Sequence, residues 1–123
     1  LDSNYKILGV IPFIDMLSLM KYSLSVINPS KSEGLSNSVE QAKALGKKVI
    51  LSNIPVHKEQ LSDNFYYFNS NDNRKLASLM CKIAKSKVKW SETKINKIKK
   101  NNLIKNLNFA RSFQEFIIRY TDN

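Results

Sequence analysis

Short apolar runs alternate along the chain with segments in which apolar side chains recur at helical spacing. The run 24–27 is apolar except for Ser25 and ends at Asn28-Pro29-Ser30, a pattern typical of a buried parallel strand. Between Phe13 and Tyr22 the apolar residues fall at mixed helical spacing, which predicts a short helix. On the same criteria we expect further strands within 5–12, 48–51 and 65–68.

Cap residues set the expected ends of two further helices. Asn37 is a candidate N-cap after the polar loop 28–36, and Glu40, three residues on, approximates a capping box. Gly46 suits the left-handed position that ends this helix. The next helix has three candidate caps and four apolar positions: Asn71, Asp72 or Asn73, and then Leu76, Leu79, Met80 and Ile83.

The C-terminal part of the chain is basic and predicts two more helices. One starts at 91–93 and passes through Ile95 and Ile98. The other, within 106–123, is amphipathic and has one apolar face, made of Phe113, Phe116, Ile117 and Tyr120. The whole order of elements predicts an α/β layer structure with a mostly parallel sheet over 1–123.

Composition narrows the class of protein. The chain has 123 residues, enough for one domain, and 42% of them are hydrophobic, so a buried core is expected. Twenty Lys and Arg residues against ten Asp and Glu residues give a formal charge of +10, which favours anionic partners. No apolar stretch is long enough to span a bilayer. Cys81, the one cysteine, permits no internal disulfide, so we expect a cytoplasmic protein with Cys81 as a buried, inert thiol.

Two loops are the best candidates for a binding site, because ligands of open parallel sheets bind beyond the carboxyl ends of the strands. These are 28–36 and 52–60. In the first loop, Gly34 lets the backbone approach a ligand, and the following helix presents N–H groups suited to a diphosphate. Glu33 can accept hydrogen bonds from sugar hydroxyls; the alternative is a solvated loop glutamate.

Glu40 and His57 each have two interpretations. The Glu40 carboxylate can accept both hydroxyls of a ribose, or it can serve only as the capping-box residue of its helix. His57, the one histidine, is expected to be a structural or surface group rather than a catalyst. A zinc site has no support, since Cys81 lies in another predicted element.

The segment 29–52 contains a Pro-Ser pair, Glu33-Gly34, the second glutamate Glu40, and then Ala and Gly before a strand that ends in a small polar residue. In this pattern it resembles the group 1 retaining glycosyltransferases of the GT-B fold, which implies a Rossmann-like domain with three α/β/α layers. The spacing between the two glutamates is one residue shorter than the family pattern. The resemblance implies that Glu33 is catalytic and contacts the donor sugar, and that Glu40 holds the ribose. It implies six donor-binding residues: Glu33, Gly34, Leu35, Ser36, Asn37 and Glu40.

The same resemblance implies that the chain is the donor-binding, C-terminal half of an enzyme whose amino-terminal domain it lacks. The enzyme would transfer a sugar from a nucleotide diphosphate sugar to a saccharide or lipid-linked acceptor, with no cofactor and no metal. The helix within 106–123 would dock on the amino-terminal domain, or pack as an ordinary core helix. The segment 94–105 would rest on anionic lipid on the inner face of the membrane, or be a solvated helix. Two other functions stay open: a basic nucleic-acid-binding module, which we disfavour, and a sugar-nucleotide epimerase or a phosphorylase with the same layout.

Overall fold

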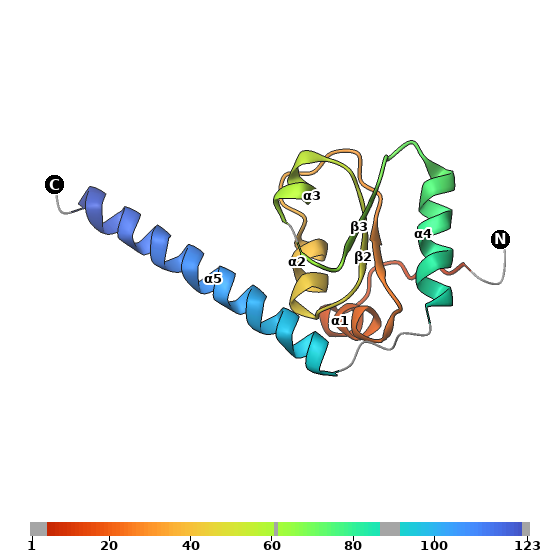
Figure 1. The fold of residues 1–123 in the computed structure, drawn as a ribbon, viewed down its shortest axis with the longest axis horizontal. Coiled ribbons are helices and arrows are strands. Elements are labelled where there is room, and N and C mark those ends of the chain that lie inside the picture. Colours follow the sequence, from red (N-terminus) through yellow and green to blue (C-terminus); the bar gives the residue numbers. More distant parts are fainter. Residues whose placement is uncertain (1–4, 61, 87–91, 122–123) are drawn as a thin grey trace.

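The computed structural model describes residues 5–60, 62–86 and 92–121. Helices and strands alternate along most of this length (Figure 1). The elements are α1 (Phe13–Tyr22), β1 (Val26–Asn28), α2 (Asn37–Ala44), β2 (Val49–Ser52), α3 (Pro55–Glu59), β3 (Phe65–Phe68), α4 (Asn73–Lys85) and α5 (Glu92–Thr121). The predicted α/β fold is confirmed at this level.

The three strands form a parallel sheet in the order β1-β2-β3. In the register of the sheet, Val49 pairs with Val26 on one side and with Phe65 on the other. All four residues of β2 are buried, as expected for a central parallel strand covered on both faces. The carboxyl ends of β1 and β2 therefore lie at the same edge, and the loops that follow them are neighbours.

Two apolar clusters hold helices on opposite faces of the sheet. Side chains of one strand alternate between faces, so Val49 and Leu51 lie in one cluster and Ile50 in the other. The first cluster receives Val39 and Ala42 from α2, and the second receives Leu79 and Ile83 from α4. Figure 1 shows α2 and α4 on either side of the strands.

The segment 5–12 is not a strand, which corrects the sequence prediction. Within the described residues β1 is the edge strand of the sheet, and this apolar segment does not pair with it. Its residues Ile7 and Val10 are exposed. The edge position also explains why Ile27 of β1 is 37% exposed, although a buried strand was predicted there.

The helix α1 is confirmed with the predicted bounds and is tied to the rest of the domain by Lys47. The Lys47 ammonium donates to the carbonyl oxygens of Lys21, at 3.0 Å, and of Ser23. A cation at this position satisfies carbonyl groups that have no partner inside the helix and complements the helix dipole. Burial, and then the charge of Lys48, lower the pKa of the Lys47 ammonium.

The helix α4 confirms one cap and overturns the prediction for its cysteine. Asp72 is the N-cap, and its carboxylate accepts a hydrogen bond from the Lys75 N–H at 2.8 Å. Cys81 is exposed rather than buried. The buried residues of α4 are Leu79 and Ile83, and a side chain two residues from both lies on the opposite side of the helix.

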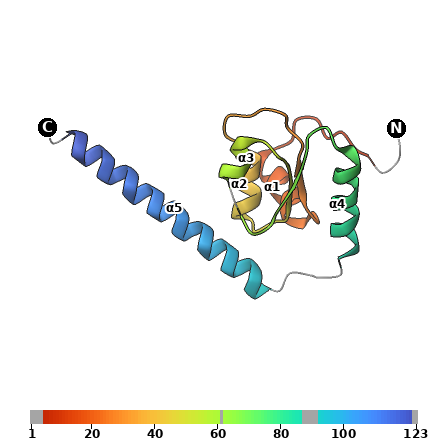
Figure 2. The ribbon, with the colours of Figure 1, turned by 45° about the horizontal axis from the view of Figure 1, so that its top comes forward.

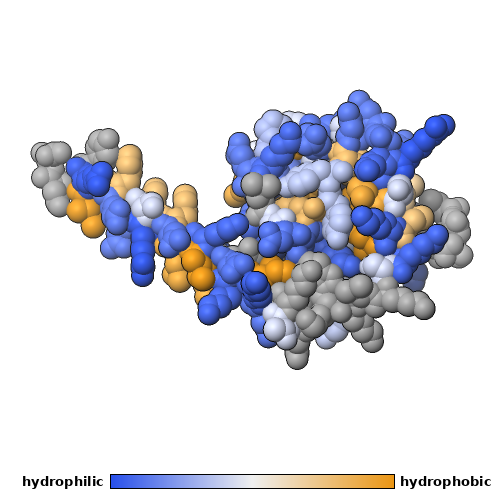
Figure 3. Space-filling model, in the orientation of Figure 1, coloured by the Kyte–Doolittle hydropathy of each residue, from blue (hydrophilic) through white to orange (hydrophobic). Residues whose placement is uncertain are grey.

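The C-terminal helix α5 is one element of 30 residues, where two shorter helices were predicted. Its first part packs on the domain near α2, where Ile98 is buried, and the rest extends away from the body (Figures 1 and 2). Apolar side chains are exposed along this extension, Phe109 and Phe113 among them (Figure 3). None of the helices in the described residues combines the length and apolar character needed to cross a bilayer.

Candidate functional site

Two loops meet at the carboxyl edge of the sheet, as predicted. The loop 29–36 follows β1, and the short helix α3 follows β2. The second segment was expected to be a loop, but Pro55 stands at the first helical position, where its fixed φ favours a helix. The loop contacts the end of β2, where the Ser52 hydroxyl donates to the Ser30 carbonyl, and it contacts α3, where His57 Nε2 lies 3.6 Å from Glu33 Oε2.

Asn28, the last residue of β1, organises the first loop. Its amide Nδ2 donates to Glu33 Oε1 at 2.9 Å and to the Ser36 hydroxyl at 2.8 Å. Its carbonyl Oδ1 accepts from the Ser30 N–H at 3.1 Å. Asn28 is not among the site residues predicted from the sequence. A polar residue that closes an apolar strand at its carboxyl end is the signal that would have pointed to it.

Glu33 is held within the site rather than solvated. Its side chain is 21% exposed. The hydroxyl of Ser36 lowers the pKa of the Glu33 carboxyl most strongly, against an opposing effect of burial, and Asn28, Ser30 and the charge of His57 lower it further. Glu33 is therefore a carboxylate at neutral pH, with hydrogen-bond donors that fix one of its oxygens.

The N-terminus of α2 has no side-chain cap, which corrects the predicted capping box. The N-cap is Ser36, not Asn37, and no side-chain hydrogen bond caps the helix. The reason is that the Ser36 hydroxyl accepts from Asn28 and lies 3.3 Å from the Ser38 hydroxyl instead. Asn37 is the exposed first residue of the helix. Because Glu40 is then four residues from the cap, it is not a capping-box residue.

Glu40 lies in the first turn of α2 and accepts hydrogen bonds from two residues. Its Oε1 accepts from Lys43 Nζ at 3.2 Å and from Gln60 Nε2 at 3.0 Å, and its Oε2 accepts from Lys43 Nζ at 3.3 Å. Gln60 Nε2 also donates to the Ser36 carbonyl at 3.1 Å, so it links Glu40 to the end of the loop. Glu40 borders a hollow of about 430 Å³ between α2 and α5, which Lys99 also lines. Glu33 does not line that hollow, so the structure places the two glutamates in adjacent but separate surroundings.

His57 is fully buried in α3. Its Nδ1 lies 2.9 Å from the Ser52 carbonyl oxygen, which can only accept, so Nδ1 carries a proton. The Tyr67 hydroxyl donates to the His57 carbonyl at 3.1 Å, and burial raises the pKa of that phenol. Ser52, His57 and Glu33 do not form a hydrolytic triad, because Ser52 is buried and its hydroxyl donates to the Ser30 carbonyl.

The remaining predicted residues leave the outer side of the loop open. Gly34 and Leu35 are exposed, and a Cβ atom added to Gly34 would meet no atom within 4 Å. A ligand can therefore approach the backbone here without a side chain in its way. Within the described residues, no three His, Cys, Asp or Glu side chains gather closely enough to hold a metal ion.

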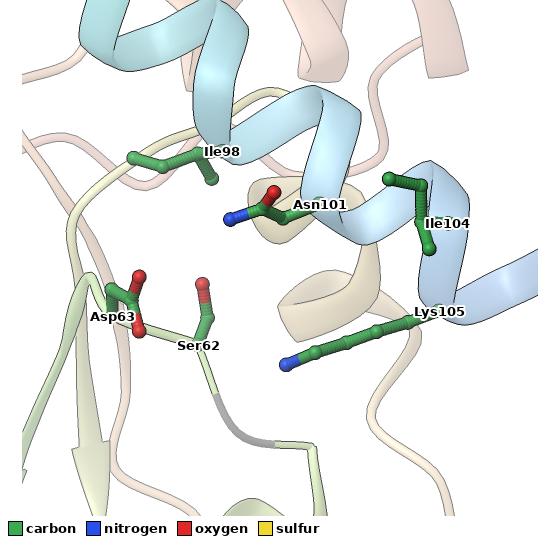
Figure 4. A pocket seen from close by; sticks show the side chains of 6 residues that line it. All are labelled: Ser62, Asp63, Ile98, Asn101, Ile104 and Lys105. Carbon is green, nitrogen blue, oxygen red and sulfur yellow. The ribbon is translucent and has the colours of Figure 1, made fainter.

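Two further hollows lie away from the predicted glutamates. One, of about 520 Å³, lies beyond β2 and β3 and is lined by Lys58, Tyr67 and Lys75 among others. The other, of about 270 Å³, lies between α5 and the turn before β3. There Asn101 and Lys105 point toward the turn that carries Ser62 and Asp63 (Figure 4). Neither hollow contains a residue assigned to the donor.

Comparisons of this chain with protein families, with curated proteins and with solved structures found no match. The residue pattern of 29–52 and the geometry around Glu33 and Glu40 are therefore what bear on its function.

Proposed function

We propose that this chain is the donor-binding part of a retaining glycosyltransferase of the GT-B fold, which transfers a sugar from a nucleotide diphosphate sugar to a saccharide or lipid-linked acceptor. One observation carries the proposal. The loop 29–36 fixes an ionised glutamate, Glu33, beside a helix N-terminus that has no side-chain cap. These are the groups that a sugar and a diphosphate require next to each other.

The start of α2 supports a diphosphate role. The first N–H groups of a helix lack partners inside the helix and carry its positive dipole end. Here the serine that would cap them is engaged by Asn28 instead. A diphosphate is the kind of anion that binds such a terminus, and the chain's charge of +10 favours its approach. The backbone of Ser36 and Asn37 would provide these contacts, and they would stabilise the charge on the departing diphosphate.

Glu33 is the residue we assign to the donor sugar. A carboxylate accepts hydrogen bonds from neighbouring hydroxyls, and the low pKa of Glu33 keeps it in that form. The adjacent Gly34 and Leu35 are exposed, which leaves room for a sugar over the loop. In this proposal Glu33 orients the sugar for transfer, with no cofactor.

Glu40 is the residue we assign to the ribose. The side chain of Glu40 is 37% exposed, and Lys43, which binds both carboxylate oxygens, and Gln60, which binds Oε1, fix its orientation. Glu40 is not needed as a capping-box residue of α2. Two hydroxyls on adjacent carbons match the acceptor geometry of one carboxylate.

The finer features of the fold also belong to this proposal. The helices α2 and α4 would be the outer layers of a Rossmann-like α/β/α domain, and an amino-terminal domain would close the cleft over the loop. The extended part of α5, with exposed Phe109 and Phe113, would dock on that domain. A cytoplasmic enzyme that rests on the inner membrane surface fits the basic residues of α5, although Ile98, expected on the lipid-facing side, packs on the domain.

The test is an NMR titration of the chain with UDP-glucose, GDP-mannose and ADP-glucose. We expect amide shifts at 33–40 and 52–60 with the sugar nucleotide that carries the correct base. Glu40→Gln should weaken binding about tenfold, because a hydrogen bond to a charged group is lost. Glu115→Gln, the same change at an exposed residue of α5, should leave it unaltered. Shifts scattered away from the loop, or equal affinities in the two variants, would contradict the assignment.

A nucleic-acid-binding module is the second candidate, and α5 is the observation in its favour. Lys97, Lys99 and Lys100 are exposed on a helix that extends from the domain. Phosphate contacts of this kind produce affinities that fall steeply with salt. Binding of mixed-sequence RNA or DNA with such a slope, together with no response to sugar nucleotides, would favour this candidate over the transferase.

A further inference from the structure

His57 is a buried residue to which the proposed function assigns no role. Its ring lies under the loop 29–36, with one nitrogen occupied and the other not. Nδ1 is bound to the Ser52 carbonyl at 2.9 Å and therefore carries a proton. Nε2 is buried, has no hydrogen-bond partner among the described residues, and lies 3.6 Å from Glu33 Oε2.

The two possible protonation states of the ring have different consequences for Glu33. In a neutral ring with its proton on Nδ1, a lone pair on Nε2 would face the lone pairs of a carboxylate, and a buried polar atom would stay unsatisfied. In a doubly protonated ring, the Nε2–H points at an ionised oxygen. This state satisfies both groups, and it suits a carboxylate that Asn28 already holds at its other oxygen.

The surroundings of the His57 ring indicate that Glu33 is the group with which Nε2 interacts. Ser52 of β2 binds Nδ1, and Tyr67 of β3 donates to the backbone of His57 rather than to the ring. Its chain neighbours Lys58 and Glu59 are exposed. Glu33 is the charged group that contacts Nε2 from the loop.

We propose that His57 is a positioning residue for Glu33, which it holds from beneath by a charged Nε2–H so that the outer face of the carboxylate receives the hydroxyls of the donor sugar. The part of this inference that concerns the sugar rests on the proposed function. The contact between His57 and Glu33 is independent of it. Asn28 and His57 then fix one oxygen each. The carboxylate keeps a single orientation before a ligand arrives, which lowers the entropic cost of binding.

The first arm of the test examines the free protein. His57 is the one histidine of the chain, so ¹⁵N labelling of histidine gives one pair of ring signals. We expect both ring nitrogens to carry a proton in the parent, as the contacts to Ser52 and Glu33 require. In Glu33→Gln we expect a proton on Nδ1 alone, because the variant amide can donate to Nε2. Identical ring signals in the two proteins would overturn the contact.

The second arm compares two neutral substitutions of His57. A glutamine amide reaches the place of Nε2 and keeps a donor toward Glu33, whereas an asparagine amide reaches the place of Nδ1 and keeps only the Ser52 contact. Each folded variant is titrated with UDP-glucose, GDP-mannose and ADP-glucose and with the matching nucleoside diphosphate. We expect His57→Asn to lose about tenfold in affinity for the sugar nucleotide and little for the diphosphate, and His57→Gln to lose less than about threefold.

The outcomes separate the two proposals. Equal losses for the sugar nucleotide and the diphosphate would mean that His57 acts only through the fold, and would overturn the positioning role. Equal behaviour of the asparagine and glutamine variants would overturn it as well. If the parent binds no sugar nucleotide, the donor role fails, and the ring signals of the first arm still decide whether His57 holds Glu33. The same signals decide the question if His57→Asn does not fold.

Discussion

Replacement of Asn28 by aspartate changes one donor into an acceptor with almost no change in shape. In the parent, Nδ2 donates to Glu33 Oε1 at 2.9 Å, and Oδ1 accepts from the Ser30 N–H. In Asn28→Asp the second contact survives, but the first becomes a close pair of carboxylate oxygens. The variant therefore tests whether the loop is organised by the Asn28 amide.

The size of the effect follows from that one contact. Loss of a hydrogen bond to a charged group costs about 1.5–3 kcal/mol. Two like charges near 4 Å repel by about 4 kcal/mol at an effective dielectric constant of 20, and partial exposure and uptake of a proton lower this figure. We expect Asn28→Asp to reduce the free energy of unfolding by about 3 kcal/mol near pH 7, a large part of the about 5–15 kcal/mol typical of a domain.

Urea unfolding followed by circular dichroism measures this difference. Asn37→Asp is the matched control, because it makes the same change of charge at an exposed residue in the first turn of α2. A negative charge there is favourable, by about 0.3–1 kcal/mol. The loss in Asn28→Asp should also shrink as the pH falls toward 4, where one of the two carboxyls takes up a proton. Equal stabilities of the two variants near pH 7, or a loss that does not depend on pH, would refute the role of Asn28.

Two other predictions concern the same loop and the helix that follows it. The hydroxyl of Ser36 lowers the pKa of the Glu33 carboxyl from its ordinary value. The contribution of Glu33 to stability is therefore complete above the ordinary pKa of a glutamate, about 4.3, and is lost as the pH falls through the pKa of the folded state. The difference in free energy of unfolding between the parent and Glu33→Gln should therefore narrow in acid, and a difference that is constant from pH 7 to about pH 3 would contradict this. Gly46 has a φ of 69°, so Gly46→Ala should cost about 1–2 kcal/mol in urea unfolding. Gly34→Ala, where an added Cβ meets open space, should change stability by less than about 0.5 kcal/mol, and equal effects at the two glycines would count against this explanation.

The elements that the sequence predicted well are those whose signals are local. The spacing of apolar residues in 13–22 and the aromatic run 65–68 depend on nothing outside the segment, and both elements have the predicted bounds. Gly46 ends α2 in the left-handed conformation for the same reason. Asp72 was one of three candidate caps, and only the geometry of the turn selects it.

The elements that the sequence mispredicted depend on contacts between segments. The apolar run in 5–12 resembles a strand, but a strand forms only by pairing with another strand, and within the described residues this segment pairs with none. The N-cap of α2 is Ser36 rather than the predicted Asn37. The position of Ser36 depends on a hydrogen bond from the amide of Asn28, eight residues earlier. His57 was expected to be structural or at the surface. Its burial against Ser52, a residue of β2, follows from the way α3 folds back over the end of that strand.

The register of β1 and β2 couples the Glu33 site to the fold. Asn28 pairs with Leu51, so Ser52 lies just beyond the end of β1 and reaches both Ser30 and His57. A shift of one residue would turn Asn28 toward the other face of the sheet and dismantle the site. A ligand that binds this loop therefore binds the folded state and not the unfolded state.

This coupling predicts that the correct donor stabilises the protein by mass action. At about one hundred times its dissociation constant, a ligand specific for the folded state adds about 2.7 kcal/mol to the free energy of unfolding. The measurement is urea unfolding of the parent with and without the sugar nucleotide, and of Glu33→Gln at the same concentration. Glu33→Gln should gain about 1.4 kcal/mol less if it binds tenfold more weakly, because the gain depends on the logarithm of the affinity. If binding is detected by NMR but the midpoint in urea does not move, the ligand binds a part of the chain that stays accessible in the unfolded state, and the assignment of the donor to this loop is wrong.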